Sequence, residues 1–253
     1  MEIRYLENNE KNRIRALYES VFEDKKEYVD FLFSTQINKH KVLVMLEGDK
    51  IVSMLQLVPK KVCYRRELLN VHYIFAVATA REYRKKGYMK ELLQKALRDL
   101  KARGERFTYL IPTNPAFYEG LGFVYKYKRT IYDLEPVEEK NIVYSPGEMD
   151  IKVMMALCDK YLANKYNTFL VHDEEYFDRI LKELSIENGY LVYHRDGEEI
   201  VAYSLVDSSH NVIESVFKNI PSGLTIKDKK PYVMVKVLDD KTDVGKFFVN
   251  DET

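Results

Sequence analysis

The segment FAVATAREYRKKGYMKELLQKAL, residues 75–97, constrains the fold of this chain more than any other part of the sequence. It begins as a β-type apolar run, passes through cationic residues around Gly87, and continues with the spacing of an amphipathic helix. This order predicts a strand, a glycine turn and a helix that packs its apolar stripe on a sheet. The start of a helix presents unpaired backbone N–H groups and the positive end of the helix dipole, which suits a phosphate group. The turn contains neither GKS or GKT nor GxGxxG, and a basic glycine turn by itself is usually a solvated loop.

Composition narrows the class of protein. The chain has 253 residues with 40 basic and 40 acidic side chains, so no global field attracts nucleic acid or anionic lipid. No apolar stretch approaches the ~20 residues of a membrane helix, and the charged N-terminus lacks an apolar signal region. Cys63 and Cys158 lie far apart without metal-ligand spacing, and the histidines form no such spacing either. We therefore expect a soluble cytoplasmic protein with no metal and no nucleic-acid or membrane partner.

The apolar patterns indicate two consecutive units. The polar segment 135–150 lacks apolar periodicity and is interpreted as a linker between a first unit, 1–135, and a second unit, 150–253. VLVMLEGDKIV (42–52) aligns with LVYHRDGEEIV (191–201) at a shift of 149 positions, which favours duplication over the chance similarity of two hairpins. The second unit contains no basic glycine turn that opens a helix. The main expected strands are 41–46, 51–58, 61–64, 69–78, 107–112, 190–194, 200–206 and 212–217, and the main expected helices lie near 14–21, 28–32, 92–100, 151–162 and 174–184.

Several short motifs follow one another along the first unit. The strand ends in VAT (77–79), the turn is RKKGYM (84–89), and LIPTN (110–114) and FYEGLGF (117–123) come downstream. With these motifs the chain resembles the GNAT superfamily of acetyl-CoA-dependent N-acetyltransferases, whose members have an R/Q-x-x-G-x-G/A turn after such a strand and, further on, a strand, an asparagine and an (F/Y)Y-x-x-x-GF segment. The resemblance covers about residues 1–130, and Met89 departs from it, because the family commonly has glycine or alanine there.

The repeated second half is similar to the branch that contains the enhanced-intracellular-survival acetyltransferases. Those proteins carry two fused GNAT-like units followed by a sterol-carrier-like domain. PYVMVKVLD (231–239) resembles the beginning of that third domain, but too few residues come after it. We therefore expect the third domain to be absent.

The resemblance implies an α/β (α+β) GNAT fold, with a mixed central sheet flanked by helices and a second, incomplete GNAT-like unit. It implies acetyl-CoA as cosubstrate, with the pantetheine arm on the strand edge and the diphosphate on the turn. The cofactor-binding residues that it implies are Val77, Ala78, Thr79, Arg84, Lys85, Lys86, Gly87, Tyr88, Met89, Lys90, Thr113 and Asn114. It also implies that the backbone N–H of Val77 stabilises the oxyanion, and that Tyr118 is the general acid when an amine attacks the thioester directly.

The general base and the acceptor stay open at this point. Strand 70–79 carries no carboxylate, so His72, Tyr73 or a water relay could take the proton, although a histidine among apolar neighbours is more often structural. Glu23, Asp24, Glu27 and Asp30 could attract a cationic amine, but a solvated helix face explains them better.

The expected function is N-acetyl transfer, an acyltransferase activity of EC 2.3.1 type, to a small-molecule or peptide amine. The second unit is expected to close one side of the acceptor cleft, and the possibility of a homo-oligomer is left open. The alternative is a non-catalytic acyl-CoA-binding sensor or scaffold. A nucleic-acid binder is disfavoured by the neutral net charge.

Overall fold

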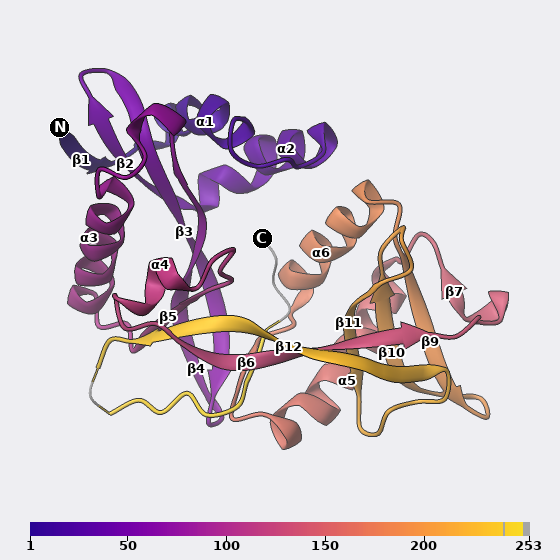
Figure 1. Cartoon of the computed structure of the whole chain (residues 1–253). Coiled ribbons are helices and arrows are strands. Elements are labelled where there is room, and N and C mark those ends of the chain that lie inside the picture. The colour runs from indigo at the N-terminus through magenta and orange to yellow at the C-terminus, as the bar shows by residue number, and fades with distance from the viewer. Residues whose placement is uncertain (240, 250–253) are drawn as a thin grey trace.

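The computed structural model describes residues 1–239 and 241–249. Within these residues, the strands form two sheets (Figure 1). The larger one has nine strands: seven follow the order β1-β2-β3-β4-β5-β12-β6, while β8 pairs with β3 and β13 pairs with β8. The smaller one has four strands in the order β11-β10-β9-β7. In the larger sheet β4 and β5 are parallel, whereas β1 to β4 pair antiparallel. The expected fold class, a mixed central sheet flanked by helices, is confirmed.

The first unit supplies most strands of the larger sheet. Its elements are β1 (Glu2–Tyr5), α1 (Arg15–Glu19), α2 (Lys26–Phe31), β2 (Lys41–Glu47), β3 (Lys50–Tyr64), β4 (Glu67–Thr79), α3 (Tyr88–Ala102), β5 (Phe107–Leu110), α4 (Ala116–Glu119) and β6 (Val124–Leu134). The later elements are β7 (Ile142–Val143), α5 (Glu148–Lys165), β8 (Thr168–Leu170), α6 (Glu174–Ile186), β9 (Tyr190–Asp196), β10 (Glu199–Val206), β11 (Val212–Phe217), β12 (Leu224–Val237) and β13 (Phe247–Phe248). Short 3-10 or π turns lie at Asn8–Ile14, Leu32–Gln36, Ile37–Lys39, Arg81–Tyr83 and Glu139–Asn141.

Helix α3 and the pair α1–α2 cover opposite faces of strands β2–β4 (Figure 1). The apolar stripe predicted for α3 consists of Leu92, Leu93, Ala96, Leu97 and Leu100. All of these are buried in the main core except Leu97, which is half-buried against it. Burying each leucine stabilises the fold by about 1.5–3 kcal/mol. Since a helix of this length is marginal by itself in water, we expect this packing to supply most of its stability. On the other face, side chains of α1 and α2 such as Tyr18 and Val29 form a second core cluster.

The strands expected at 51–58 and 61–64 are one continuous strand, so the break between them was predicted wrongly. Pro59 lies inside β3 and faces His72 of β4. On the other edge of β3 the pairing with β2 ends at Leu57, and the pairing with β8 begins at Val62. Pro59 thus falls where that edge has no strand partner among the described residues, and its missing N–H breaks no ladder bond.

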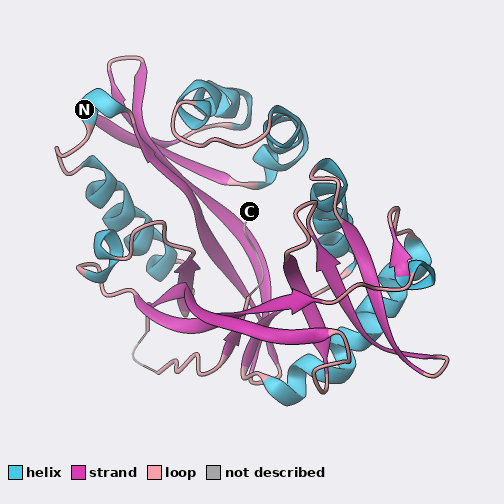
Figure 2. Ribbon diagram, turned by 45° about the vertical axis from the view of Figure 1, so that its right-hand side comes forward, coloured by secondary structure: helices cyan, strands magenta, loops and turns pink. Residues whose placement is uncertain are grey.

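The segment PYVMVKVLD (231–239) was interpreted as similar to the beginning of a third domain. Its residues 231–237 instead belong to β12, so that interpretation is wrong for them. This strand lies between β5 and β6 in the larger sheet, where Met234 pairs with both Leu110 and Tyr125. Figure 2 shows β6 and β12 as a long two-stranded ribbon that crosses from one part of the molecule to the other. The larger sheet therefore contains strands from both sides of the predicted linker 135–150, and the two predicted units do not each have a sheet of their own. Residues 240 and 250–253 of the expected second unit lie outside the described residues.

The segment expected as a linker, 135–150, is partly regular, because β7 pairs with β9 and α5 begins at Glu148. Helix α5 packs against β10 and β11, while α6 contacts both α5 and α2. The contact between α2 and α6 joins the helical layers of the two units.

Candidate active site

Strands β4 and β5 diverge at the centre of the larger sheet. Within the described ranges 1–239 and 241–249 they pair at a single position, Tyr73 with Tyr109. The far part of β4 is still paired with β3 on its other edge, with Ser53 opposite Thr79. The backbone of β4 from Phe75 to Thr79 therefore presents an unpaired strand edge toward β5, and such an edge can pair with an extended ligand.

A bulge shapes this edge. Gln56 pairs with Phe75 and Met54 pairs with Ala78, so two residues of β4 lie opposite one residue of β3. Ala76 at the bulge has φ +48°, a left-handed conformation that alanine rarely adopts. A bulge turns the backbone of the following residue, Val77, and strain of this kind is concentrated at functional sites.

The basic turn after β4 forms a concave backbone. Lys85 has φ +63° and Gly87 has φ +87°, and α3 begins directly afterwards at Tyr88. Left-handed residues before a helix start direct successive N–H groups toward one point, where an anion can bind. A Cβ atom on Gly87 would meet no atom within 4 Å, so glycine is required by the backbone conformation and the space above it is open.

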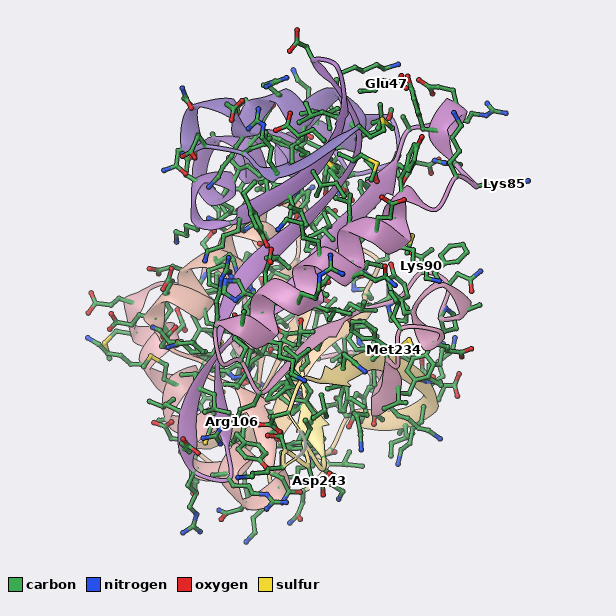
Figure 3. The ribbon with its side chains drawn as sticks, turned by 90° about the vertical axis from the view of Figure 1, so that its left-hand side faces the viewer. Glu47, Lys85, Lys90, Arg106, Met234 and Asp243 are labelled. Carbon is green, nitrogen blue, oxygen red and sulfur yellow. The ribbon has the colours of Figure 1, made fainter. Side chains whose placement is uncertain are left out.

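The cationic side chains of the turn have different contacts. Arg84 donates from Nε to the carbonyl of Thr79 at 3.0 Å, and the Lys86 Nζ lies 4.9 Å from the Tyr83 ring centroid. Figure 3 shows Lys85 extending from the turn into solvent. Met89, the departure from the family pattern, is half-buried and packs against the main core.

A cleft of about 580 Å³ opens between the two units beside the diverging strands. Its residues from the first unit are Tyr18, Phe22, Asp24, Tyr28, Tyr73, Ile74, Phe75, Ala76, Val77, Leu110, Ile111, Thr113 and Tyr118. Its residues from the second unit are Ile180, Glu183, Leu184, Glu187, Asp207 and Ile213. The cleft thus brings together Val77, Thr113 and Tyr118 of the sequence-predicted set, and the second unit forms one of its walls.

Tyr118 lies on α4, which follows β5 after the loop of residues 111–115. Its side chain is 8% exposed and packs edge-on against Phe123, with ring centroids 6.0 Å apart. Burial raises the pKa of Tyr118 to about 12, so the phenol keeps its proton at neutral pH. Asn114 Oδ1 accepts from the backbone N–H of Ala116 at 3.1 Å and thereby supports the start of α4.

His72 does not line this cleft. Its Nδ1 lies 2.7 Å from Glu105 Oε1, and its backbone N–H donates to Glu105 Oε2 at 3.0 Å. The hydroxyl of Thr108 donates to the carbonyl of His72 at 2.6 Å. These bonds join β4 to the loop after α3 and to β5, which is a structural arrangement; the role of His72 as general base stays a prediction.

Asp24 is solvent-exposed, as the sequence suggested, but it lies in the loop between α1 and α2 and not on a helix face. It also lines the cleft. The cleft residues of the second unit could not be found from the sequence, because no motif marks them and only the packing of α6 brings them to the cleft.

Within the described residues, no group of three or more histidine, cysteine, aspartate or glutamate side chains is arranged to hold a metal ion. In the same part of the chain, no helix has both the length and the apolar character needed to span a bilayer.

Comparisons with known proteins agree on one family. A model described as an acetyltransferase (GNAT) domain matches residues 2–126, about half of the chain. Similar solved structures include a conserved protein of unknown function from Enterococcus faecalis V583, described as a probable N-acyltransferase, with TM-score 0.74, 13% identity and coverage of 94% of this chain and 72% of that one. A GCN5-related N-acetyltransferase from Anabaena variabilis has TM-score 0.68, 13% identity and coverage of 94% and 73%. Eis1 from Mycobacterium abscessus has TM-score 0.66, 11% identity and coverage of 94% and 74%. At these identities the structural similarity shows the fold, and comparison with curated proteins gave no match.

Proposed function

Because residues 2–126 belong to the GNAT acetyltransferase domain family, we propose that this protein transfers the acetyl group of acetyl-CoA to a primary amine of a small molecule or peptide. Acetyl transfer is the activity of the family, and we propose for this chain a cofactor position, a mechanism and an acceptor class in addition.

The shape of the site supports acetyl-CoA as the cosubstrate. The backbone of residues 84–90 would hold the diphosphate through the left-handed residues Lys85 and Gly87 and the start of α3. The pantetheine arm would extend along the unpaired edge of β4 at Val77, Ala78 and Thr79, and Thr113 would line its other side. Asn114 would contribute by holding α4 in place.

The chemistry proposed needs no covalent enzyme intermediate. The amine lone pair forms the C–N bond, and the carbonyl π electrons move to oxygen, where the N–H of Val77 stabilises the charge. The C–S bond then breaks, and the sulfur takes the proton from the Tyr118 hydroxyl. A proton of the new amide nitrogen returns to Tyr118, so the side chain is restored.

One observation carries this proposal: the cleft contains Tyr118 and the bulged, unpaired edge of β4 together, and the anion-binding turn comes directly after that edge. Each feature alone has structural explanations. Together they present an extended-chain site, an anion site and a proton donor in the order in which acetyl-CoA requires them.

A thiol-release assay with acetyl-CoA and a panel of amines tests the function. Replacing Tyr118 by Phe should reduce turnover about 100-fold or more, because the thiolate then leaves without a proton donor. Calorimetry should show unchanged acetyl-CoA binding. Tyr125→Phe is the matched control, since Tyr125 is an exposed tyrosine on the neighbouring strand β6.

The second candidate, an acyl-CoA sensor or scaffold, is favoured by the absence of a carboxylate on β4 after Glu67 and by the engagement of His72 with Glu105. Tight acetyl-CoA binding without turnover of any amine would establish the sensor and exclude the enzyme. Failure to bind acetyl-CoA would exclude both.

A further inference from the structure

The carboxylate of Asp24 is directed by a buried tyrosine. Tyr18 is 1% exposed, and its hydroxyl donates to Asp24 Oδ2 at 2.6 Å. Burial, together with this hydrogen bond, raises the pKa of Tyr18, so the hydroxyl stays a neutral donor. Both residues line the cleft that contains Tyr118. A loop carboxylate is thereby held at a defined place in the wall of the proposed active site.

The other carboxylates of the cleft are occupied. Glu183 receives two hydrogen bonds from Arg179 on the same helix, and Glu187 forms an ion pair with Lys25. Asp207 accepts from the backbone N–H groups of residues 209 and 211 in its own turn. By contrast, no donor to the Oδ1 atom of Asp24 is present in the described part of the chain. This atom can therefore bind a ligand without breaking an existing contact.

The charge of the cleft also favours a cation. Its wall contains four carboxylates, and no lysine or arginine lines it among the described residues. Glu183 and Glu187 are paired with Arg179 and Lys25 beside the cleft, whereas Asp24 and Asp207 have no ion pair in the described part of the chain. The titratable and charged groups that face Asp24, or lie directly beside the cleft, are Tyr18 of α1, Lys25 before α2, Tyr28 of α2, Tyr73 of β4, Tyr118 of α4, Arg179, Glu183 and Glu187 of α6 and its end, and Asp207 after β10.

We propose that Asp24 binds the acceptor in its ammonium form and takes the proton that the acceptor must lose before it attacks, with Tyr18 as the positioning residue. This inference rests on the proposed acetyl transfer. An ammonium ion has no lone pair, so one N–H bond must break before the C–N bond can form. Asp24 accepts that proton and releases it to water, which leaves one proton in solution for each acetyl group transferred. The remaining protons move through Tyr118, which protonates the sulfur and recovers a proton from the amide nitrogen.

The neighbouring acids do not share this position. Asp30 forms an ion pair with Arg15 at 2.5 Å, and neither Glu23 nor Glu27 lines the cleft. The sequence VFEDKKEYVD thus contains four acids, of which one reaches the cleft. This contrast supplies matched control variants.

The experiment compares Asp24→Asn with Asp30→Asn in the full chain. With the best amine of a panel, Asp24→Asn should lower kcat/KM about 100-fold near neutral pH, while acetyl-CoA binding stays unchanged. Activity of this variant should recover toward alkaline pH, where the free amine no longer needs a proton acceptor; a purely structural defect would not recover. Tyr18→Phe should cause a smaller loss in the same direction, and Asp30→Asn should behave like the wild type.

Each outcome separates the inference from the function on which it rests. If Asp24→Asn has the same kcat/KM as the wild type at every pH, the role of Asp24 is overturned, whereas the proposed acetyl transfer is not affected. If the wild type turns over no amine, the proposed function fails, and 1,4-diaminobutane titrated calorimetrically into the CoA complex then tests Asp24 as a cation site. Binding that Asp24→Asn abolishes supports the site, whereas no binding, or equal binding by both proteins, overturns it.

Discussion

The hairpins β2–β3 and β9–β10 have the same construction. Gly48 and Gly197 occupy the two turns, 149 positions apart, and each has φ +58°. In the first hairpin the pairing steps from Met45–Ser53 to Leu46–Ile51, and in the second it steps from His194–Ala202 to Arg195–Ile200. All four pairs correspond at the same shift of 149, so the two ladders carry the same bulge. This agreement supports the proposal of a duplicated unit.

The strands after the two hairpins differ. After the first hairpin, β4 leads to the basic turn and α3, and its edge toward β5 is open. After the second, β11 leads through a turn at Gly223 to β12, which joins the larger sheet. The acid of β11, Glu214, is fully enclosed and accepts hydrogen bonds from Tyr176 and Tyr203. The two hairpins therefore have the same structure, and the units differ in the strand that follows: β4 has an open backbone edge, whereas the polar side chain of Glu214 on β11 is enclosed.

The largest expected effect comes from removing the second unit. A fragment of residues 1–140 lacks β12, which separates β5 from β6 and pairs with both. Without it, the backbone edges of β5 and β6 are left unpaired and the buried side chains of β5 lose part of their cover, so the fragment should aggregate or remain unfolded. Size-exclusion chromatography and circular dichroism check this. A monomeric fragment with cooperative unfolding and full activity would show that the first unit is independent of the second.

A smaller effect, on the pH dependence of stability, comes from one buried histidine at each of the two hairpins. His40 lies 2.7 Å from Gln56 Oε1, and His194 lies 2.8 Å from Ser204 Oγ. Burial lowers the pKa of each to about 4. The unfolded chain, with histidine near pKa 6.5, takes up protons that the folded protein excludes, so stability should fall as pH drops from about 6.5 toward 4. Each histidine should contribute roughly 1–3 kcal/mol to that loss.

Urea unfolding at several pH values measures these contributions. His40→Gln and His194→Gln should each flatten the decrease in the free energy of unfolding, and the double variant should flatten it further. His210→Gln is the control, because His210 is exposed. Variants that keep the wild-type pH dependence would contradict the buried neutral state of both histidines.

The smallest effect comes from replacing the glycines of three turns by alanine, and it distinguishes the proposed diphosphate-binding turn from the two hairpin turns. Gly48, Gly87 and Gly197 all have positive φ, and a Cβ on any of them would meet no atom within 4 Å. Alanine at each position should therefore cost about 1 kcal/mol of stability for conformational reasons alone. We expect only Gly87→Ala to weaken acetyl-CoA binding, by about tenfold, because its Cβ occupies the space above the anion site. Calorimetry and thermal unfolding give the two readouts, and equal losses of affinity in all three variants would argue against the position of the diphosphate.

Much of the local structure could be predicted from the sequence. The period of Leu92, Leu93, Ala96 and Leu100 predicted α3, and it is buried as expected. Gly87 was predicted to allow a backbone bend, and its φ of +87° confirms this. Patterns of this kind are local, because a helix period or a left-handed residue depends on neighbours within a few positions.

The long-range arrangement could not be predicted in the same way. The position of β12 between β5 and β6 depends on pairing between residues about a hundred positions apart, and no local signal specifies such a register. The sequence predicted separate strands at 51–58 and 61–64, whereas β3 continues through Pro59, because one edge of β3 has no strand partner there among the described residues. Asp24 is a surface acid, as its sequence position suggested, but only the folded chain shows that its carboxylate accepts from Tyr18 and lines the cleft.

The amino-acid sequence by itself determined the strand, basic glycine turn and helix of residues 75–97, together with the motif that identifies the family. The tertiary structure alone decided which residues line the cleft that contains Tyr118, including the wall that α6 of the second unit contributes. The physical reason is range: backbone conformation depends on neighbouring side chains, whereas a cleft between units exists only after distant apolar surfaces have packed together.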